Sequence, residues 1–182
     1  MAFLTRQQID NMGFLFVGED VKISEYARFY RPYSIVIGDH SRIDDFCILS
    51  AGVGGIEIHS YVHIACYSSL IGQAKITMED YSGISSRVAV YSSSDAYDGE
   101  YMTNPCLPSH VLNTKHNPVT LGKHVVIGSG STVLPGVHLE NCSVGAMSLV
   151  TKSCNDFVIL AGIPAKPIKE RVKRYLELEK TL

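Results

Sequence analysis

Residues 125–139 read VVIGSGSTVLPGVHL. An aliphatic residue recurs here every six positions, at Ile127, Val133 and Leu139, and small or polar residues fill most of the positions between. A period of six matches neither the 3.6-residue period of an α-helix nor the two-residue alternation of a half-buried strand. The stretch therefore predicts a repeating unit in which each six-residue step makes one short strand and one turn.

The same spacing extends over most of the chain. Hydrophobic residues six positions apart form four further runs: Val17, Ile23, Phe29 and Ile35; Ile37, Ile43 and Leu49; Ile58, Ile64, Leu70 and Ile76; and Met78, Ile84 and Val90. The opening run itself begins at Leu121, and Val144 and Val150 continue it after a gap one residue short. We expect three units to make one triangular coil, with the repeated side chains inside and small residues such as Gly128 at tight corners.

Two segments interrupt the repeat. Residues 51–57 (AGVGGIE) form a short glycine-rich insertion, and residues 92–118 form a longer one with three prolines and little apolar periodicity. We expect the longer segment to be a loop that protrudes from one corner of the solenoid. Long loops inside compact domains are typically functional, so this loop is a candidate part of an active site.

The two ends of the chain depart from the repeat. Thr5 with Gln8 three positions later matches a capping box and predicts a helix from Thr5 to about Met12 that covers one end of the core. The final stretch IKERVKRYLELEKTL predicts a C-terminal helix from about Ile168. The sequence thus predicts one mainly β domain over residues 1–182.

Composition narrows the class of protein. The chain has 182 residues, of which 46% are hydrophobic and 19% charged, with a net charge of −2, so no electrostatic feature favours nucleic acid or an anionic membrane. Neither a transmembrane run nor a signal peptide is expected. Five widely spaced cysteines without a CxxC pair favour a reducing cytoplasm and thiols that act as buried small hydrophobes.

Three motifs carry a family resemblance. IGSGSTVLPGVHL, VGAMSLVTKS and AGIPAKPIKER resemble the hexapeptide-repeat acyltransferases, which implies a left-handed parallel β-helix, an acyl-CoA donor and homotrimers with active sites between neighbouring prisms. RIDDFCILSAGVGGIEI, HIACYSSLIG and YSSSDAYDGEYMTNP look like sugar acetyltransferases of surface-polysaccharide assembly, among them the dTDP-4-amino-4,6-dideoxyglucose N-acetyltransferases. This resemblance implies acetyl-CoA as co-substrate, a nucleotide-linked amino sugar as acceptor, and no metal.

The resemblance also suggests a catalytic residue. Related galactoside acetyltransferases use a histidine at the start of the protruding loop as base, and in MEDYSGISSRVAVYSSSD that position falls on Asp95. Aspartate is a weaker base, but it can bind an ammonium group, so Asp95 fits an amine acceptor better than a hydroxyl. Asp95 could instead merely cap a turn. His63, directly before the inward Ile64, is the alternative base, or else a structural histidine.

Further residues are candidates for binding. Arg42 and Asp45 cluster with Asp44 in RIDDF and either bind sugar hydroxyls or form a solvated corner, whereas Tyr97 and Tyr101 either stack on a nucleotide base or anchor the loop. The family's coenzyme positions match Ser129 and Ala146 beside the pantetheine arm, the pair Thr151 and Lys152, and the basic tail positions Lys166 and Lys169. Lysine suits a coenzyme phosphate as a compact charge, although a solvated basic face is the alternative.

Other classes of protein fit the sequence less well. A zinc hydratase similar to γ-class carbonic anhydrases needs three converging histidines, and the seven histidines, including His59 and His63, show no such pairing. A non-catalytic scaffold would leave the long loop unexplained. GSGS at 128–131 lies inside the repeat and is structural. The sequence therefore predicts a cytoplasmic, acetyl-CoA-dependent sugar N-acetyltransferase, with O-acetylation of a sugar hydroxyl as the open alternative.

Overall fold

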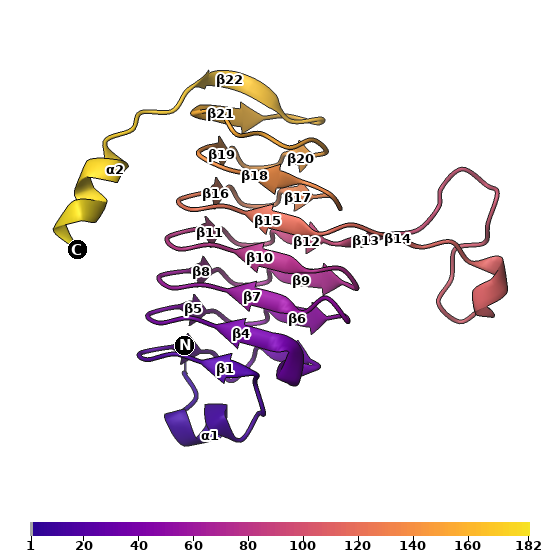
Figure 1. Ribbon diagram of the computed structural model, residues 1–182, viewed down its shortest axis with the longest axis horizontal. Coiled ribbons are helices and arrows are strands. Elements are labelled where there is room, and N and C mark those ends of the chain that lie inside the picture. The colour runs from indigo at the N-terminus through magenta and orange to yellow at the C-terminus, as the bar shows by residue number, and fades with distance from the viewer. Residues whose placement is uncertain (1) are drawn as a thin grey trace.

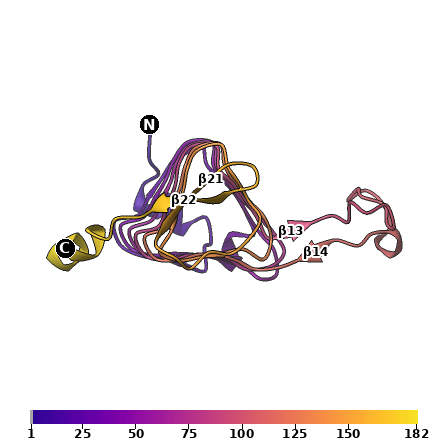
Figure 2. The ribbon, with the colours of Figure 1, turned by 90° about the horizontal axis from the view of Figure 1, so that it is seen from above.

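The chain folds into a triangular prism of stacked coils, as the computed structural model of residues 2–182 shows (Figures 1 and 2). Face 1 consists of β1 (Phe16–Val17), β4 (Ile35–Ile37), β7 (Ile56–Ile58), β10 (Ile76–Met78), β15 (Val119–Leu121) and β18 (His138–Leu139). Face 2 consists of β2 (Lys22–Ile23), β5 (Arg42–Ile43), β8 (His63–Ile64), β11 (Gly83–Ile84), β16 (Val126–Ile127), β19 (Ser143–Val144), β21 (Val158–Ala161) and β22 (Lys166–Glu170). Face 3 consists of β3 (Arg28–Tyr30), β6 (Ile48–Ala51), β9 (Ser69–Gly72), β12 (Ala89–Tyr91), β17 (Thr132–Val133) and β20 (Leu149–Val150).

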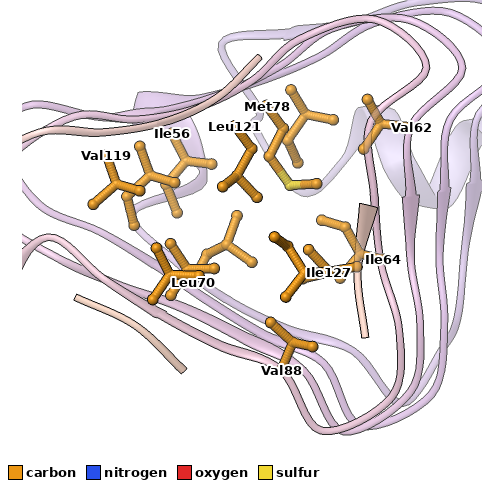
Figure 3. Close-up of a cluster of buried hydrophobic side chains, with 14 of the residues drawn as sticks. Ile56, Val62, Ile64, Leu70, Met78, Val88, Val119, Leu121 and Ile127 are labelled. Carbon is orange, nitrogen blue, oxygen red and sulfur yellow. The ribbon is translucent and has the colours of Figure 1, made fainter. Parts of the chain in front are cut away.

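The six-residue repeat fills the interior of the prism, which confirms the predicted parallel β-helix. Ile84 is paired in parallel register with Ile64 in the coil below and Ile127 in the coil above, and each of the three side chains is at most 2% exposed. Figure 3 shows such residues from all three faces meeting in one core. Complete burial of an isoleucine side chain contributes about 1.5–3 kcal/mol, so the stacked columns stabilise each coil against its neighbours.

The corners use two kinds of residue. Gly128 behaves as predicted, because a Cβ atom there would lie 2.4 Å from the backbone nitrogen of Ala146 in the next coil. Other corners hold large residues in the left-handed backbone region, such as Phe46 at φ 62° and Tyr67 at φ 62°. Their rings stack with centroids 5.0 Å apart. Ring stacking of about 0.5–1.5 kcal/mol offsets part of a backbone cost of about 1–2 kcal/mol per residue.

The N-terminal helix closes one end of the prism as predicted. Helix α1 spans Arg6–Asp10, and the side chains of Thr5 and Gln8 form the expected capping box. Ile9 points into the core and is only 2% exposed, so the helix shields the first coil from water (Figure 1).

The predicted start of the C-terminal helix, at about Ile168, is wrong. Residues Lys166–Glu170 form β22, which pairs antiparallel with β21. This pairing gives the backbone N–H and C=O groups of β21 hydrogen-bond partners, which a helical turn containing Pro167 would not do. Helix α2 starts only at Tyr175 and ends at Leu178, and a 3₁₀ turn, η3, follows over Glu179–Thr181.

The long insertion protrudes from the corner between faces 3 and 1, as predicted (Figures 1 and 2). Its ends pair as the antiparallel strands β13 (Ser93–Ser94) and β14 (Lys115–His116), and it contains the 3₁₀ turn η2 (Ser109–Val111). A further 3₁₀ turn, η1, spans Pro32–Ser34. No helix within residues 2–182 combines the length and apolar character needed to cross a membrane.

The cysteines are all unpaired: Cys47 and Cys142 are buried, Cys66 and Cys154 are partly exposed, and Cys106 is exposed. Burial raises the pKa of Cys47 to about 11 and that of Cys142 to about 12. Since thiolates are the reactive species, a thiol reagent at neutral pH should label Cys106 within the first minutes and leave Cys47 and Cys142 unmodified until the protein is unfolded. Mass spectrometry of timed samples checks this order, and early labelling of Cys47 would contradict it.

Candidate active site

Asp95 lies where the protruding loop leaves the prism, directly after β13. Its Oδ1 accepts a hydrogen bond of 3.2 Å from the Thr114 hydroxyl, which lies directly before β14 on the returning segment of the loop. Asp95 lines two cavities, one on each side of its coil. The structure thus places the predicted catalytic residue at a junction between two spaces that a donor and an acceptor can enter.

The lower cavity, toward the N-terminal coils, has a volume of about 490 Å³. It is lined by Ser50, Ala51, Gly52, Ile71, Gly72, Gln73, Ser93, Asp95, Asn104, Pro105, Leu112, Thr114 and His116. Many of these side chains are small or carry hydrogen-bonding groups, which suits a hydroxylated ligand. The floor comes from β6 and β9, and the cover comes from the protruding loop.

His116 is a functional candidate that sequence reasoning missed. It lies opposite Ser93 in the β13–β14 pair, with its Nδ1 atom 2.8 Å from the Ser93 hydroxyl oxygen. That oxygen also accepts the backbone N–H of Gln73 at 2.8 Å, which ties the base of the loop to the coil below. The signal in the sequence was weak, because only the antiparallel register of the loop ends brings His116 beside the cavity of Asp95.

The upper cavity, toward the C-terminal coils, has a volume of about 580 Å³. It is lined by Tyr91, Ser93, Ser94, Asp95, Tyr97, Thr114, Thr132, Leu134 and Pro135. Tyr97, predicted to contact substrate, is 85% exposed at this cavity. Tyr101 is 43% exposed and lines neither cavity beside Asp95, so Tyr97 alone of the two tyrosines borders the candidate site.

A third cavity of about 400 Å³ lies beside the C-terminal coils and brings two predicted coenzyme residues together. Lys152 and Lys166 both line it, together with Ser153, Asn155 and the acidic Asp156. Both lysines are exposed, as a phosphate ligand requires. Two further predicted coenzyme residues, Thr151 and Lys169, do not line this cavity. Thr151 is exposed and directly precedes Lys152 in the chain, and Lys169 lies on β22 opposite Ile159.

His63 belongs to a hydrogen-bonded group on face 2. Its Nε2 atom lies 2.9 Å from Oδ2 of Asp44, whose Oδ1 accepts a 2.6 Å bond from Nε of Arg42. Asp44 is only 6% exposed, so these two side chains, and not water, stabilise its negative charge. Because a carboxylate only accepts, the proton of a neutral His63 sits on Nε2 and leaves Nδ1 free of that bond. The sequence analysis placed Asp44 beside Arg42 and Asp45 in the candidate sugar-binding cluster, and the structure shows that Asp44 orients both His63 and Arg42.

Asp45 points elsewhere than its neighbour Asp44. Its carboxylate accepts a hydrogen bond from the Ser24 hydroxyl in the coil below. Of the predicted cluster of Arg42, Asp44 and Asp45, the structure therefore pairs Arg42 with Asp44, whereas Asp45 bonds to Ser24. No group of three or more His, Cys, Asp or Glu side chains between residues 2 and 182 is arranged to hold a metal ion.

The candidate residues divide between two corners of the prism. Ser129 lines a cavity of about 350 Å³ with His63 and Ser85 at the corner between faces 2 and 3, and Ala146 lies in the turn above Ser129. Asp95 and Lys152 each come shortly after a strand of face 3 in the chain. They lie at the corner between faces 3 and 1, which we call the loop corner. Strand β12 separates the two corners, and each of its residues adds about 3.3 Å.

The chain is similar in sequence to known acyltransferases. The chain is 55% identical over 180 residues, 98% of its length and 94% of the relative's, to a dTDP-4-amino-4,6-dideoxy-D-glucose acyltransferase from Escherichia coli. It is 31% identical over 119 residues, 63% of its length and 57% of the relative's, to WbbJ of E. coli K12, a putative lipopolysaccharide biosynthesis O-acetyl transferase. No family model matches the sequence.

The solved structures agree. AntD, an N-acyltransferase from Bacillus cereus, superposes with a TM-score of 0.94 at 42% identity over 98% of this chain and 95% of that chain, in a complex with dTDP and 3-hydroxybutyryl-CoA. A serine-to-cysteine variant of AntD, bound to dTDP-4-amino-4,6-dideoxyglucose and coenzyme A, has a TM-score of 0.94 at 41% identity over the same shares of both chains.

Fold and comparisons together define the class of protein as an acyltransferase built on a parallel β-helix. More narrowly, the chain belongs to the family of dTDP-4-amino-4,6-dideoxyglucose acyltransferases. The prediction of a hexapeptide-repeat acyltransferase, and of this family among them, is confirmed.

Proposed function

We propose that the protein transfers an acyl group from coenzyme A to the amine of dTDP-4-amino-4,6-dideoxyglucose. Acetyl is the acyl group that the sequence predicts. The observation that carries the proposal is the position of Asp95 between two cavities on the corner that also holds Lys152. The family relative acts on this sugar by name, and AntD binds both the amino sugar and coenzyme A.

Transfer proceeds by direct attack in this proposal. The sugar nitrogen forms a bond to the thioester carbonyl carbon, the carbon–sulfur bond breaks, and coenzyme A leaves as a thiolate that ends with a proton. Asp95, oriented by Thr114, binds the ammonium form of the amine and takes one of its protons, which frees the nitrogen lone pair for the attack. The second proton, which the nitrogen loses once its bond to carbon has formed, goes to the departing thiolate. No side-chain nucleophile is needed, because the amine itself becomes the acylated product.

The lower cavity suits the sugar nucleotide, and the third cavity suits the coenzyme phosphates. Asn104 and His116 offer hydrogen-bonding groups to sugar hydroxyls in the lower cavity. Lys152 and Lys166 offer positive charge to phosphates in the third cavity. Tyr97 stays a candidate for substrate contact, whereas Asp45 is already engaged by Ser24.

We also propose that the active site forms between adjacent prisms of a homotrimer. The AntD variants replace a serine and an aspartate ten positions apart, and Ser85 and Asp95 have the same separation here. Ser85 lies with Ser129 at one corner and Asp95 at the other end of face 3. A single acceptor amine cannot lie against both ends of one face, but it can lie between the two corners of neighbouring protomers.

The setting proposed for this reaction is surface-polysaccharide assembly in the cytoplasm. Similarity to WbbJ supports the polysaccharide link, since that relative's name refers to lipopolysaccharide biosynthesis. Five unpaired cysteines support a reducing compartment.

Release of free thiol from acetyl-CoA tests the proposed function. We expect turnover with dTDP-4-amino-4,6-dideoxyglucose at least a hundredfold above that with dTDP-glucose, because the 4-hydroxyl of dTDP-glucose is a weaker nucleophile than an amine and offers no cation to Asp95. Simple galactosides serve as a second comparison, and mass spectrometry of the product locates the acyl group. Faster turnover on a hydroxyl acceptor would instead establish the O-acetyltransferase alternative.

A further inference from the structure

A buried carboxylate orients a histidine at the corner between faces 2 and 3. Nε2 of His63 lies 2.9 Å from Oδ2 of Asp44, which belongs to the coil below. Asp44 also accepts a 2.6 Å bond from Nε of Arg42 and is only 6% exposed, whereas the side chain of His63 is 51% exposed. The imidazole is therefore fixed through one nitrogen, while much of its ring stays accessible.

The coil above leaves space over this imidazole. Gly83 of β11 is the neighbour of His63 in the sheet and contributes no side chain that would cover the ring, and Val126 takes the next position. The cavity of about 350 Å³ lies there, and His63 lines it together with Ser85 and Ser129. Because the carboxylate lies below the ring and the cavity above it, Nδ1 is the ring nitrogen that can meet a ligand in this cavity.

The proposed reaction needs a carrier for its second proton. Asp95 takes the first proton of the ammonium group, so a protonated Asp95 cannot take another. The second proton must pass from nitrogen to sulfur while both atoms are bound to the same carbon, and direct passage would go through a small, strained ring. A neutral imidazole can accept a proton from one atom and donate it to another, which avoids this ring.

We propose that His63, oriented by Asp44, carries the second proton from the acceptor nitrogen to the sulfur of coenzyme A. The inference rests on the proposed function and on the site between protomers, and it gives His63 a role in addition to that of Asp95 rather than in its place. Once the nitrogen–carbon bond has formed, Nδ1 takes the proton, and the buried carboxylate stabilises the resulting imidazolium. The carbon–sulfur bond breaks, the imidazolium protonates the thiolate, and Asp95 releases its own proton to water.

Removal of the imidazole tests the inference. With acetyl-CoA and dTDP-4-amino-4,6-dideoxyglucose, His63→Ala should lower kcat by about 10²-fold and change the Kd of coenzyme A by no more than about twofold, because the ring transfers a proton rather than binding the donor. Millimolar imidazole should then raise kcat of this variant about tenfold, since a free ring can enter the open cavity. A purely structural histidine would give no such rescue.

His59→Ala is the matched control. His59 also pairs with a carboxylate, since its Nε2 lies 3.2 Å from Oε1 of Glu57, but it lines none of the cavities at the two corners. This variant should keep wild-type kcat, and its rate with added imidazole gives the background reaction of imidazole with the thioester.

Asp44→Asn tests the positioning residue. Its amide can donate to Nε2, which moves the imidazole proton to Nδ1 and removes the proton acceptor from the cavity, so kcat should fall while KM for both substrates stays unchanged.

The remaining outcomes separate the inference from the proposed function. Wild-type kcat in His63→Ala, or a loss of kcat that imidazole does not restore, overturns the proton transfer by His63 and leaves the proposed function intact. A raised KM with unchanged kcat shows that His63 only binds substrate, and it likewise overturns the inference. Absence of thiol release by the wild type, despite the circular dichroism spectrum of a folded β-protein, refutes the proposed function itself.

Discussion

Replacing Asp95 by asparagine is expected to lower kcat/KM for dTDP-4-amino-4,6-dideoxyglucose by about 10²–10⁴-fold, the usual contribution of a positioned general base. The substitution keeps the size of the side chain and an oxygen that can accept the bond from Thr114, so the loop should keep its position. Only the negative charge and the capacity to take a proton are lost. The Kd of coenzyme A should therefore change little, because the proposed phosphate contacts lie at Lys152 and Lys166.

Asp98→Asn provides the matched control for Asp95→Asn. Asp98 lies three positions further along the same loop, is exposed, and accepts the backbone N–H of Glu100 rather than lining either cavity. It should retain wild-type kcat/KM within about twofold, as surface substitutions usually do. Activity of Asp95→Asn within about threefold of the wild type would show that no carboxylate base is required, and His63 or His116 would then be tested next.

The sequence was sufficient to predict the prism because the repeat is a local property. The inward direction of each repeated residue, for example Ile64, Ile84 or Ile127, is determined by its own six-residue unit. Stacking of the coils then places these residues above one another in the core. The capping box at Thr5 is equally local, since both partners lie within four residues.

The side-chain partners in the site could not be predicted in the same way. His63 meets Asp44, 19 positions earlier, only because one coil of the prism brings β5 beside β8. His116 meets Ser93, 23 positions earlier, through the register of the loop ends. Such contacts depend on the number of residues in each coil and loop, and a motif comparison does not supply that register.

The C-terminal error has a different cause. The stretch after Ile168 is rich in helix formers, and propensity alone predicts a helix there. The edge of β21 provides unpaired backbone groups, and β22 satisfies them before the chain can turn into α2. Tertiary pairing therefore decides this segment.

Mixed assemblies of two inactive variants are expected to regain activity, because the proposed site joins two corners from different protomers. Asp95→Asn damages the loop corner, and Ser129→Trp blocks the other corner at an exposed position without entering the core. Each variant alone should retain about 1% of wild-type activity or less. A Ser129→Trp protomer still has an intact loop corner, and an Asp95→Asn protomer still has an intact Ser129 corner. In a one-to-one mixture each corner of a given site is intact with a probability of one half, so both are intact in one quarter of the sites. Co-expressed protein should therefore reach about one quarter of wild-type activity.

The matched control pairs Asp95→Asn with Lys152→Glu, which both lie at the loop corner. Every loop corner in that mixture carries a defect, so no activity should return, although the same number of substitutions is present. Native mass spectrometry verifies that both mixtures contain hybrid assemblies. Rescue in both mixtures, or in neither while hybrids are present, would contradict a site shared between protomers. Rescue only in the first mixture requires that the amine deprotonated at Asp95 of one protomer be acylated by a thioester lying against Ser129 of the next.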